Sequence, residues 1–251
     1  MSPVETSSIV FVCVLAGALL GMLLRKLLPE HHLSDNSQNI VMLAMGLVAA
    51  MTALVLGLLI SSAKSAFDAL SSEITSTSSK IIFLDHTLAL YGPETKEARH
   101  LLRDAMAGVL NRMESKESAN LRQWQTSTRD GDALYEEVQG LLPKDDRQRS
   151  LKAEALSILL EIRQTRWLMY AQESTSMSVP MLIILVSWLT ALFMSFGLFA
   201  PVNGTVAASL LVSALSVSCA ILLILEMYAP YHGLIRLSGE PLRAALTQMG
   251  I

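Results

Sequence analysis

A row of small side chains recurs at every fourth residue of one long apolar stretch. Residues four apart share one face of an α-helix, and in lipid such a face lets two helix backbones pack closely. In an oligomeric channel, small and hydroxyl side chains also leave room for partly hydrated ions. Both interpretations stay open. The second predicts that the pore is lined by Ala49, Thr52, Ala53, Leu56, Gly57 and Ser61.

Three charged side chains lie close to the ends of apolar stretches. Glu226 is the carboxylate of the last long apolar region, and an ionisable group at membrane depth is by default a functional hypothesis. Because it lies near the end of that region, it could also simply reach water or pair with Arg236 or Arg25. Lys64 and Asp68 follow the small row. We predict that they form the mouth of the pore and bias the sign of the ion, with ordinary solvated charges as the alternative.

No set of residues is typical of an active site or a cofactor site. The chain has no GxSxG, no HExxH and no Gly-rich phosphate loop. The neighbouring His31 and His32 would point about 100° apart on a helix, unlike a ligand pair spaced by four. Cys13 and Cys219 lie in separate apolar runs. We therefore expect no catalytic residues, no metal, no cofactor and no enzymatic activity.

Four apolar runs are long enough to cross a bilayer, which takes about 20 helical residues. The last two come from one uncharged stretch of 52 residues between Glu173 and Glu226, which the turn signal at Pro201–Gly204 divides. In the first run, Gly17 and Gly21 have the GxxxG spacing of a close helix contact. The four expected spans are Thr6–Leu24, Ile40–Ser62, Val179–Ala200 and Thr205–Tyr228.

Most of the charge lies between the two pairs of spans. Ser62–Met177 holds 15 of the 19 Lys and Arg residues and 17 of the 22 Asp and Glu residues. The fold class is therefore all-α: a four-span membrane protein with a large helical insert. The expected regions are spans one and two (1–62), the insert (63–178), spans three and four (179–228) and a C-terminal tail (229–251).

The insert is expected to consist of helices. No Gly or Pro occurs between Gly57 and Gly92, so the helix of span two should continue beyond the membrane. The stretch from Pro143 to Pro180 favours a second long helix that leads into span three. Between them we predict a helix that opens at Gly92-Pro93 and a shorter one over Asp132–Leu142, separated by the polar segment Ser115–Arg129.

Basic residues near the spans indicate the orientation. Arg25 and Lys26 flank one side of the membrane, and the other side has more: Lys64, Arg163, Arg166, Arg236 and Arg243. Lys and Arg are enriched in cytoplasmic loops, so both termini and the insert are expected in the cytoplasm. The net charge of −3 gives no reason to expect a nucleic-acid partner.

Several stretches resemble a bacterial membrane family that is labelled bestrophin-like and has no known function. They are Leu28–Ser34, Ala53–Asp68, Leu90–Glu94, Pro230–Ser238 and Glu240–Leu242. The similarity covers essentially the whole chain. After span four the family commonly has an acidic residue followed by Pro-Phe. Here Tyr228 replaces the acid and Tyr231 the Phe, so a role of that acid is not carried over.

Bestrophins proper are a more distant resemblance, at the level of the fold alone. They are pentameric ion channels with four spans and cytoplasmic termini, and their second span lines a narrow neck. That neck is rich in aromatic residues, whereas no Phe, Tyr or Trp occurs between Ile40 and Ser62. Their gating and selectivity are therefore not carried over.

We accordingly expect a homo-oligomeric ion channel in the lipid bilayer of the bacterial inner membrane, with inorganic ions as its cargo. The resemblance implies several copies of the chain, five in bestrophins. The alternative is a non-conducting scaffold or sensor whose cytoplasmic helices bind a partner, with Ser115–Arg129 as a docking loop. A small-solute transporter is less well supported, because the paired broken helices of such carriers are missing from the pattern.

Overall fold

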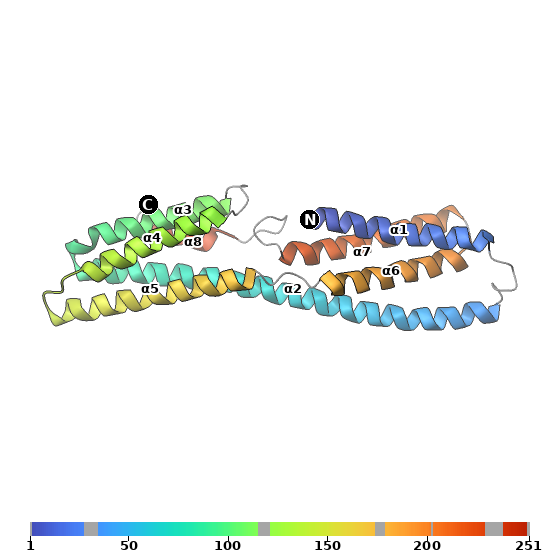
Figure 1. Cartoon of the computed structure of the whole chain (residues 1–251), viewed down its shortest axis with the longest axis horizontal. Coiled ribbons are helices and arrows are strands. Elements are labelled where there is room, and N and C mark those ends of the chain that lie inside the picture. Colours follow the sequence, from blue (N-terminus) through green and yellow to red (C-terminus); the bar gives the residue numbers. More distant parts are fainter. Residues whose placement is uncertain are drawn as a thin grey trace. The chain divides into compact units, whose positions relative to one another are not determined.

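The computed structural model describes residues 2–27, 35–114, 121–173, 179–201, 203–228 and 238–249. Throughout these ranges the regular structure is helical, which confirms the all-α class (Figure 1). The chain divides into two compact units. The apolar unit comprises Met1–Phe67 and Ser176–Ala229, and the polar unit comprises Asp68–Thr175 and Pro230–Ile251.

The apolar unit contains four helices that are long and apolar enough to cross a membrane, as the sequence predicts. They are α1 (Pro3–Leu27), the first part of α2 (Asp35–Tyr91), α6 (Val179–Phe199) and α7 (Gly204–Tyr228). The core of this unit includes Val14 of α1, Leu185 of α6 and Ile221 of α7, each at most 1% exposed. Large apolar side chains also cover much of its outside, as expected of a surface that lipid solvates.

Glycines bring α1 and α6 into close contact. A Cβ atom built on Gly21 would lie 2.0 Å from the carbonyl oxygen of Met194, and one on Gly17 would lie 2.7 Å from that of Thr190. On the facing helix, a Cβ on Gly197 would lie 2.1 Å from the carbonyl oxygen of Ala18. These separations leave no room for any side chain. The predicted GxxxG contact is therefore confirmed, and α6 supplies a third glycine.

The polar unit is a bundle of amphipathic helices. It contains the second part of α2, the short helix η2 (Pro93–Thr95), α3 (Lys96–Glu114), α4 (Leu121–Gly140), α5 (Asp146–Glu173) and α8 (Glu240–Gln248). The apolar residues recur at helical spacing and meet in one core. That core includes Leu84, Leu88, Leu102, Val138 and Ile158.

The helix of span two continues without a break to Tyr91, as predicted from the absence of Gly and Pro. It ends at Gly92, whose φ of 133° is a conformation that only glycine adopts readily. The next helical turn then begins at Pro93, as expected. Continuity between the insert and span three cannot be compared with the prediction, because residues 174–178 lie outside the described ones.

Two predicted features of the insert are wrong. The helix expected over Asp132–Leu142 begins eleven residues earlier, at Leu121, and ends at Gly140. Much of Ser115–Arg129, interpreted as a polar docking loop, is therefore the first half of α4, while residues 115–120 lie outside the described ones. The sequence did not reveal this part of the helix because its polar residues show no clear helical period.

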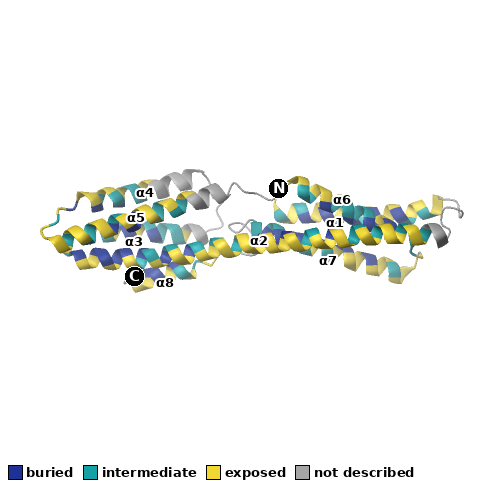
Figure 2. Ribbon diagram, turned by 90° about the horizontal axis from the view of Figure 1, so that it is seen from below, coloured by how far each residue is buried: buried dark blue, intermediate teal, exposed yellow. Residues whose placement is uncertain are grey.

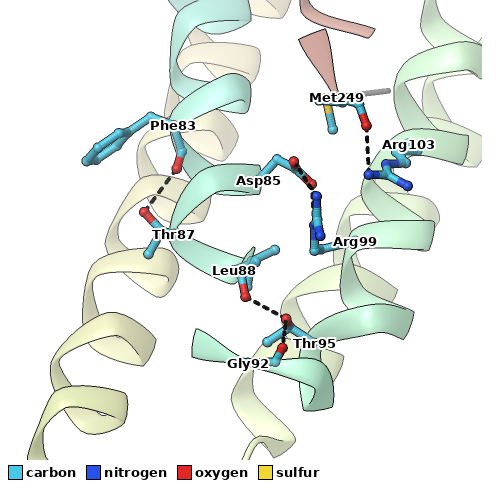
Figure 3. A network of polar contacts seen from close by, with 9 residues as sticks. All are labelled: Phe83, Asp85, Thr87, Leu88, Gly92, Thr95, Arg99, Arg103 and Met249. Carbon is cyan, nitrogen blue, oxygen red and sulfur yellow. Dashed lines mark hydrogen bonds and ion pairs between the residues drawn. The ribbon is translucent and has the colours of Figure 1, made fainter. Parts of the chain in front are cut away.

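The C-terminal helix packs into the polar unit. Leu242 and Leu246 of α8 are buried in the core that α2 to α5 form, and Met249 is 5% exposed beside them. Arg103 of α3 donates a hydrogen bond of 2.7 Å from Nη2 to the carbonyl oxygen of Met249 (Figure 3). The segment that follows span four thus forms one core with the segment between spans two and three.

Polar contacts join α2 to α3 inside this core. The carboxylate of Asp85, which is 7% exposed, accepts two hydrogen bonds from Arg99, at 2.7 Å from Nε and 2.8 Å from Nη2 (Figure 3). The hydroxyl of Thr95 donates to the carbonyl oxygen of Leu88 at 2.6 Å. The pKa of Arg99 is raised, mainly by its hydrogen bond to Asp85. These bonds fix the turn around Gly92 and hold the two helices together.

Candidate functional site

The membrane part of α2 is the least covered of the four spans. Only 11% of its most apolar window is buried, compared with 28–33% in the other three. The rest of the apolar unit therefore covers one narrow side of this helix. Its remaining surface faces lipid, a second copy of the chain or a pore.

One face of α2 packs against its own chain. Thr52, Leu59 and Ala63 are at most 5% exposed, and Leu56 is half-buried against the same core. The hydroxyl of Thr52 donates to the carbonyl oxygen of Val48 at 2.7 Å, so its polar group is satisfied within the helix. This face attaches the helix to its subunit.

A second face carries the small side chains and is open. Ala53, Gly57 and Ser61 are exposed, and Ala49 is half-exposed. Figure 2 shows exposed residues along the membrane part of α2. A Cβ atom built on Gly57 would meet nothing within 4 Å. Unlike the glycines of α1, this one is not needed for a helix contact inside the subunit.

A third face of α2 consists of bulky apolar side chains. Leu47, Leu54 and Leu58 are 58–66% exposed, and Met51 lies on the same side. This composition suits contact with acyl chains. The small face lies between the bulky face and the face that packs on the subunit.

The structure thus separates the six residues predicted to line a pore. Ala53, Gly57 and Ser61, with Ala49 at the edge, share the open small face. Thr52 and Leu56 lie on the side that turns towards the subunit's own core. The sequence could not make this distinction, because a stripe defined by spacing alone does not say which neighbouring face is already covered.

The two charges predicted for the pore mouth are both exposed. Lys64 lies near the end of the α2 segment that belongs to the apolar unit. Asp68 opens the segment that belongs to the polar unit, and it lines an open hollow there. The other described residues of this hollow are all hydroxyl-bearing: Ser71, Ser72, Thr75, Ser76 and Ser79. Sequence reasoning missed this surface, although a tract with hydroxyls at i, i+3 and i+4 is a readable signal.

Glu226 is buried inside the apolar unit, at 2% exposure. It lies two residues before Tyr228, whose hydroxyl donates to Ser62 of α2 at 3.1 Å. The residue that replaces the family's acid therefore joins the end of α7 to α2. The carboxylate of Glu226 is held within the packed subunit and does not lie on the open face of α2.

The described residues contain no group of three or more His, Cys, Asp or Glu side chains placed to hold a metal ion. His31 and His32 lie outside these residues. Cys13 and Cys219 are both free thiols.

The all-helical fold and the four exposed apolar helices define a helical membrane protein that also has a polar helical unit. The chain belongs to the bestrophin-like family: the family model described as "Bestrophin-like domain" matches residues 12–242. No similar curated protein and no similar solved structure was found.

Proposed function

We propose that the protein is a homo-oligomeric ion channel of the bacterial inner membrane and that α2 lines its pore. The observation that carries the proposal is the open row of small side chains on α2, formed by Ala53, Gly57 and Ser61, on a side of the helix that the subunit's own core leaves uncovered. Membership of the bestrophin-like family supports a membrane protein of this type.

The side chains of this row suit a wide, weakly binding passage. Around a central axis, Gly57 and Ala53 would leave space for an ion that keeps part of its water. Ser61 would offer a hydroxyl that can replace a water molecule. Conduction requires sites that bind an ion weakly enough to release it, and small neutral side chains meet that condition. Thr52 and Leu56 would form the wall behind this surface.

Reconstitution in liposomes tests the proposal. The wild-type protein is expected to pass cations or anions faster than empty vesicles do. Gly57→Leu is expected to abolish that flux while leaving the assembled mass unchanged, because the new side chain extends into open space. Ala44→Leu is the matched control, since Ala44 is exposed on the bulky side of α2 and should not affect flux. A wild-type protein without flux in either charge class would contradict the proposal and favour the scaffold.

Asp68 gives the proposal a second test, on the sign of the ion. A ring of carboxylates at the mouth raises the local concentration of cations, and one of amides does not. Asp68→Asn is therefore expected to shift the reversal potential in a salt gradient towards that of the anion. Asp145→Asn, a change of the same charge at an exposed turn of the polar unit, should leave the reversal potential unchanged.

A further inference from the structure

The polar unit carries two rows of exposed, uncharged side chains on its two longest helices. The α2 row consists of Ser72, Thr75, Ser79, Phe83 and His86, and the α5 row of Ala153, Ser157, Leu160, Gln164 and Trp167. Steps of three and four residues keep each row on one side of its helix, the pattern by which two helices pack along their length. Every member is exposed in the single chain.

The composition of these rows is unusual for an exposed surface. Neither contains Lys, Arg, Asp or Glu, although the segment Ser62–Met177 holds most of the chain's charge. Phe83, Leu160 and Trp167 expose 49–59% of their surface. Large apolar side chains at the surface of a polar bundle are typical of a protein interface.

Two contacts show which residues of α2 and α5 lie at the same height, that is, at the same position along the long axis of the bundle. The Nζ atom of Lys80 lies 3.1 Å from a carboxylate oxygen of Glu161, and the amide of Gln148 donates to the carbonyl oxygen of Tyr91 at 3.1 Å. The helices are antiparallel, so counting down one corresponds to counting up the other. Each residue of the α2 row is thereby level with one residue of the α5 row.

The paired heights match large side chains with small ones. Counted along the two rows, the level pairs are Ser72 with Trp167, Thr75 with Gln164, Ser79 with Leu160, Phe83 with Ser157, and His86 with Ala153. Trp167 and Leu160 thus lie level with serines on α2, and the aromatic ring of Phe83 lies level with a serine on α5. Such alternation allows two rows to interdigitate.

We propose that the α2 row of one copy packs against the α5 row of the next copy and so closes the oligomer through its polar units. In a ring whose axis runs along these helices, the copies are related by rotation, so the same residue lies at the same height in each. The level pairs within one chain then become facing pairs between neighbours. A contact between two different surfaces of the same chain generates a closed ring when the rotation closes. The inference rests on the homo-oligomer in the proposed function, but not on conduction.

Disulfide cross-linking tests the contact between copies. Two differently tagged chains are co-expressed with Cys13 and Cys219 replaced by alanine, so that each carries one new thiol. Ser72→Cys in one copy and Trp167→Cys in the other are expected to give a cross-linked dimer. Ser71→Cys is the matched control, because Ser71 is exposed at nearly the same height but about 100° around the helix. A cross-link that is equal for both serines, or absent from both, would overturn the proposed contact.

A charge placed in the row gives the second measurement. Leu160→Glu is expected to shift the purified protein from the assembled mass towards the monomer, with its helix content unchanged because the site is exposed. Leu142→Glu makes the same change at a site that is 85% exposed and outside both rows, and it should stay assembled. A Leu160→Glu protein that keeps the assembled mass would count against the interface.

Flux measurements separate this inference from the proposed function. An assembled wild type with the Ser72–Trp167 cross-link but without ion flux supports the interface and contradicts the channel. An assembled protein that conducts but lacks the cross-link contradicts the interface alone. A wild type that is monomeric contradicts both.

Discussion

Glycines occur in two opposite settings in the apolar unit. Gly17, Gly21 and Gly197 lie where helix backbones touch, so their lack of a side chain is used inside the subunit. Gly46 and Gly57 lie on α2, where an added Cβ would meet nothing within 4 Å. The same residue type therefore has a packing role on α1 and α6 and leaves space outside the subunit on α2. Spacing predicts the first setting, but the second depends on which faces of α2 the chain covers.

Gly21→Val should therefore destabilise the apolar unit strongly. Its Cβ would lie 2.0 Å from the carbonyl oxygen of Met194, so α1 and α6 would have to separate. Overpacking a well-packed contact typically costs about 1–3 kcal/mol, and this contact is with rigid backbone. Thermal unfolding in detergent measures the change. Gly46→Ala is the control and should unfold no earlier than the wild type, because its Cβ enters open space and alanine is the better helix former. Equal midpoints for both variants would refute the assigned helix contact.

Asp85→Asn tests the buried pair between α2 and α3. The amide can accept at one oxygen only, so Arg99 would lose a charged partner. Losing a hydrogen bond to a charged group typically costs about 1.5–3 kcal/mol of stability. We expect a smaller loss here because Arg99 is partly exposed to solvent. Chemical denaturation of the full chain measures the loss. Asp146→Asn removes an exposed pair with Arg149 and should change little; the reverse order of effects would be evidence against a structural role for Asp85.

At the scale of elements, the sequence predicts the length of an unbroken helix better than it predicts which helices pack together. α2 could be foreseen because a long stretch without Gly or Pro favours an unbroken helix. The first half of α4 could not, because its polar residues lack a clear period. The docking of α8 was also missed: Leu242 and Leu246 show that a short helix has an apolar side, but not which core receives it. The small face of α2 could be predicted from the spacing of its residues. Its exposure could not, because the spacing does not say which sides of the helix the subunit covers.

The pair between Glu94 of η2 and Lys144 before α5 predicts a pH dependence. The Nζ atom of Lys144 lies 2.5 Å from Glu94 Oε1, and this hydrogen bond lowers the pKa of the Glu94 carboxyl. A lowered pKa in the folded state means that the pair stabilises the fold above the carboxyl's ordinary pKa. That contribution is lost as the pH falls through the lowered value.

Comparing wild type with Glu94→Gln across pH isolates this contribution. The wild type should be the more stable at neutral pH, and the difference should vanish in acid. Both groups are exposed, so the effect is expected to be small and reduced by salt. A difference that is independent of pH would contradict the assignment to this pair.

For the whole molecule, the basic residues near the spans predict which side of the membrane holds the polar unit. Most basic residues near the spans favour the cytoplasm, whereas Arg25 and Lys26, in the first loop, are expected on the opposite side. The structure gives Arg25 a separate role, because its guanidinium donates to the carbonyl oxygen of Ala200 at the end of α6. A cation there satisfies a helix terminus and interacts favourably with its dipole. One of the two basic residues that oppose the orientation is therefore explained by packing.

Thiol labelling in cells decides the orientation. In a background with Cys13 and Cys219 replaced by alanine, Leu142→Cys places a thiol on an exposed turn of the polar unit, and Asn203→Cys places one between α6 and α7. With the polar unit in the cytoplasm, a membrane-impermeant maleimide should label Asn203→Cys in intact spheroplasts. It should reach Leu142→Cys only after permeabilisation. The opposite labelling pattern would show the inverted topology, with Asp68 on the outer side. The salt gradient in the Asp68→Asn experiment would then have to be interpreted with the pore mouth on that side.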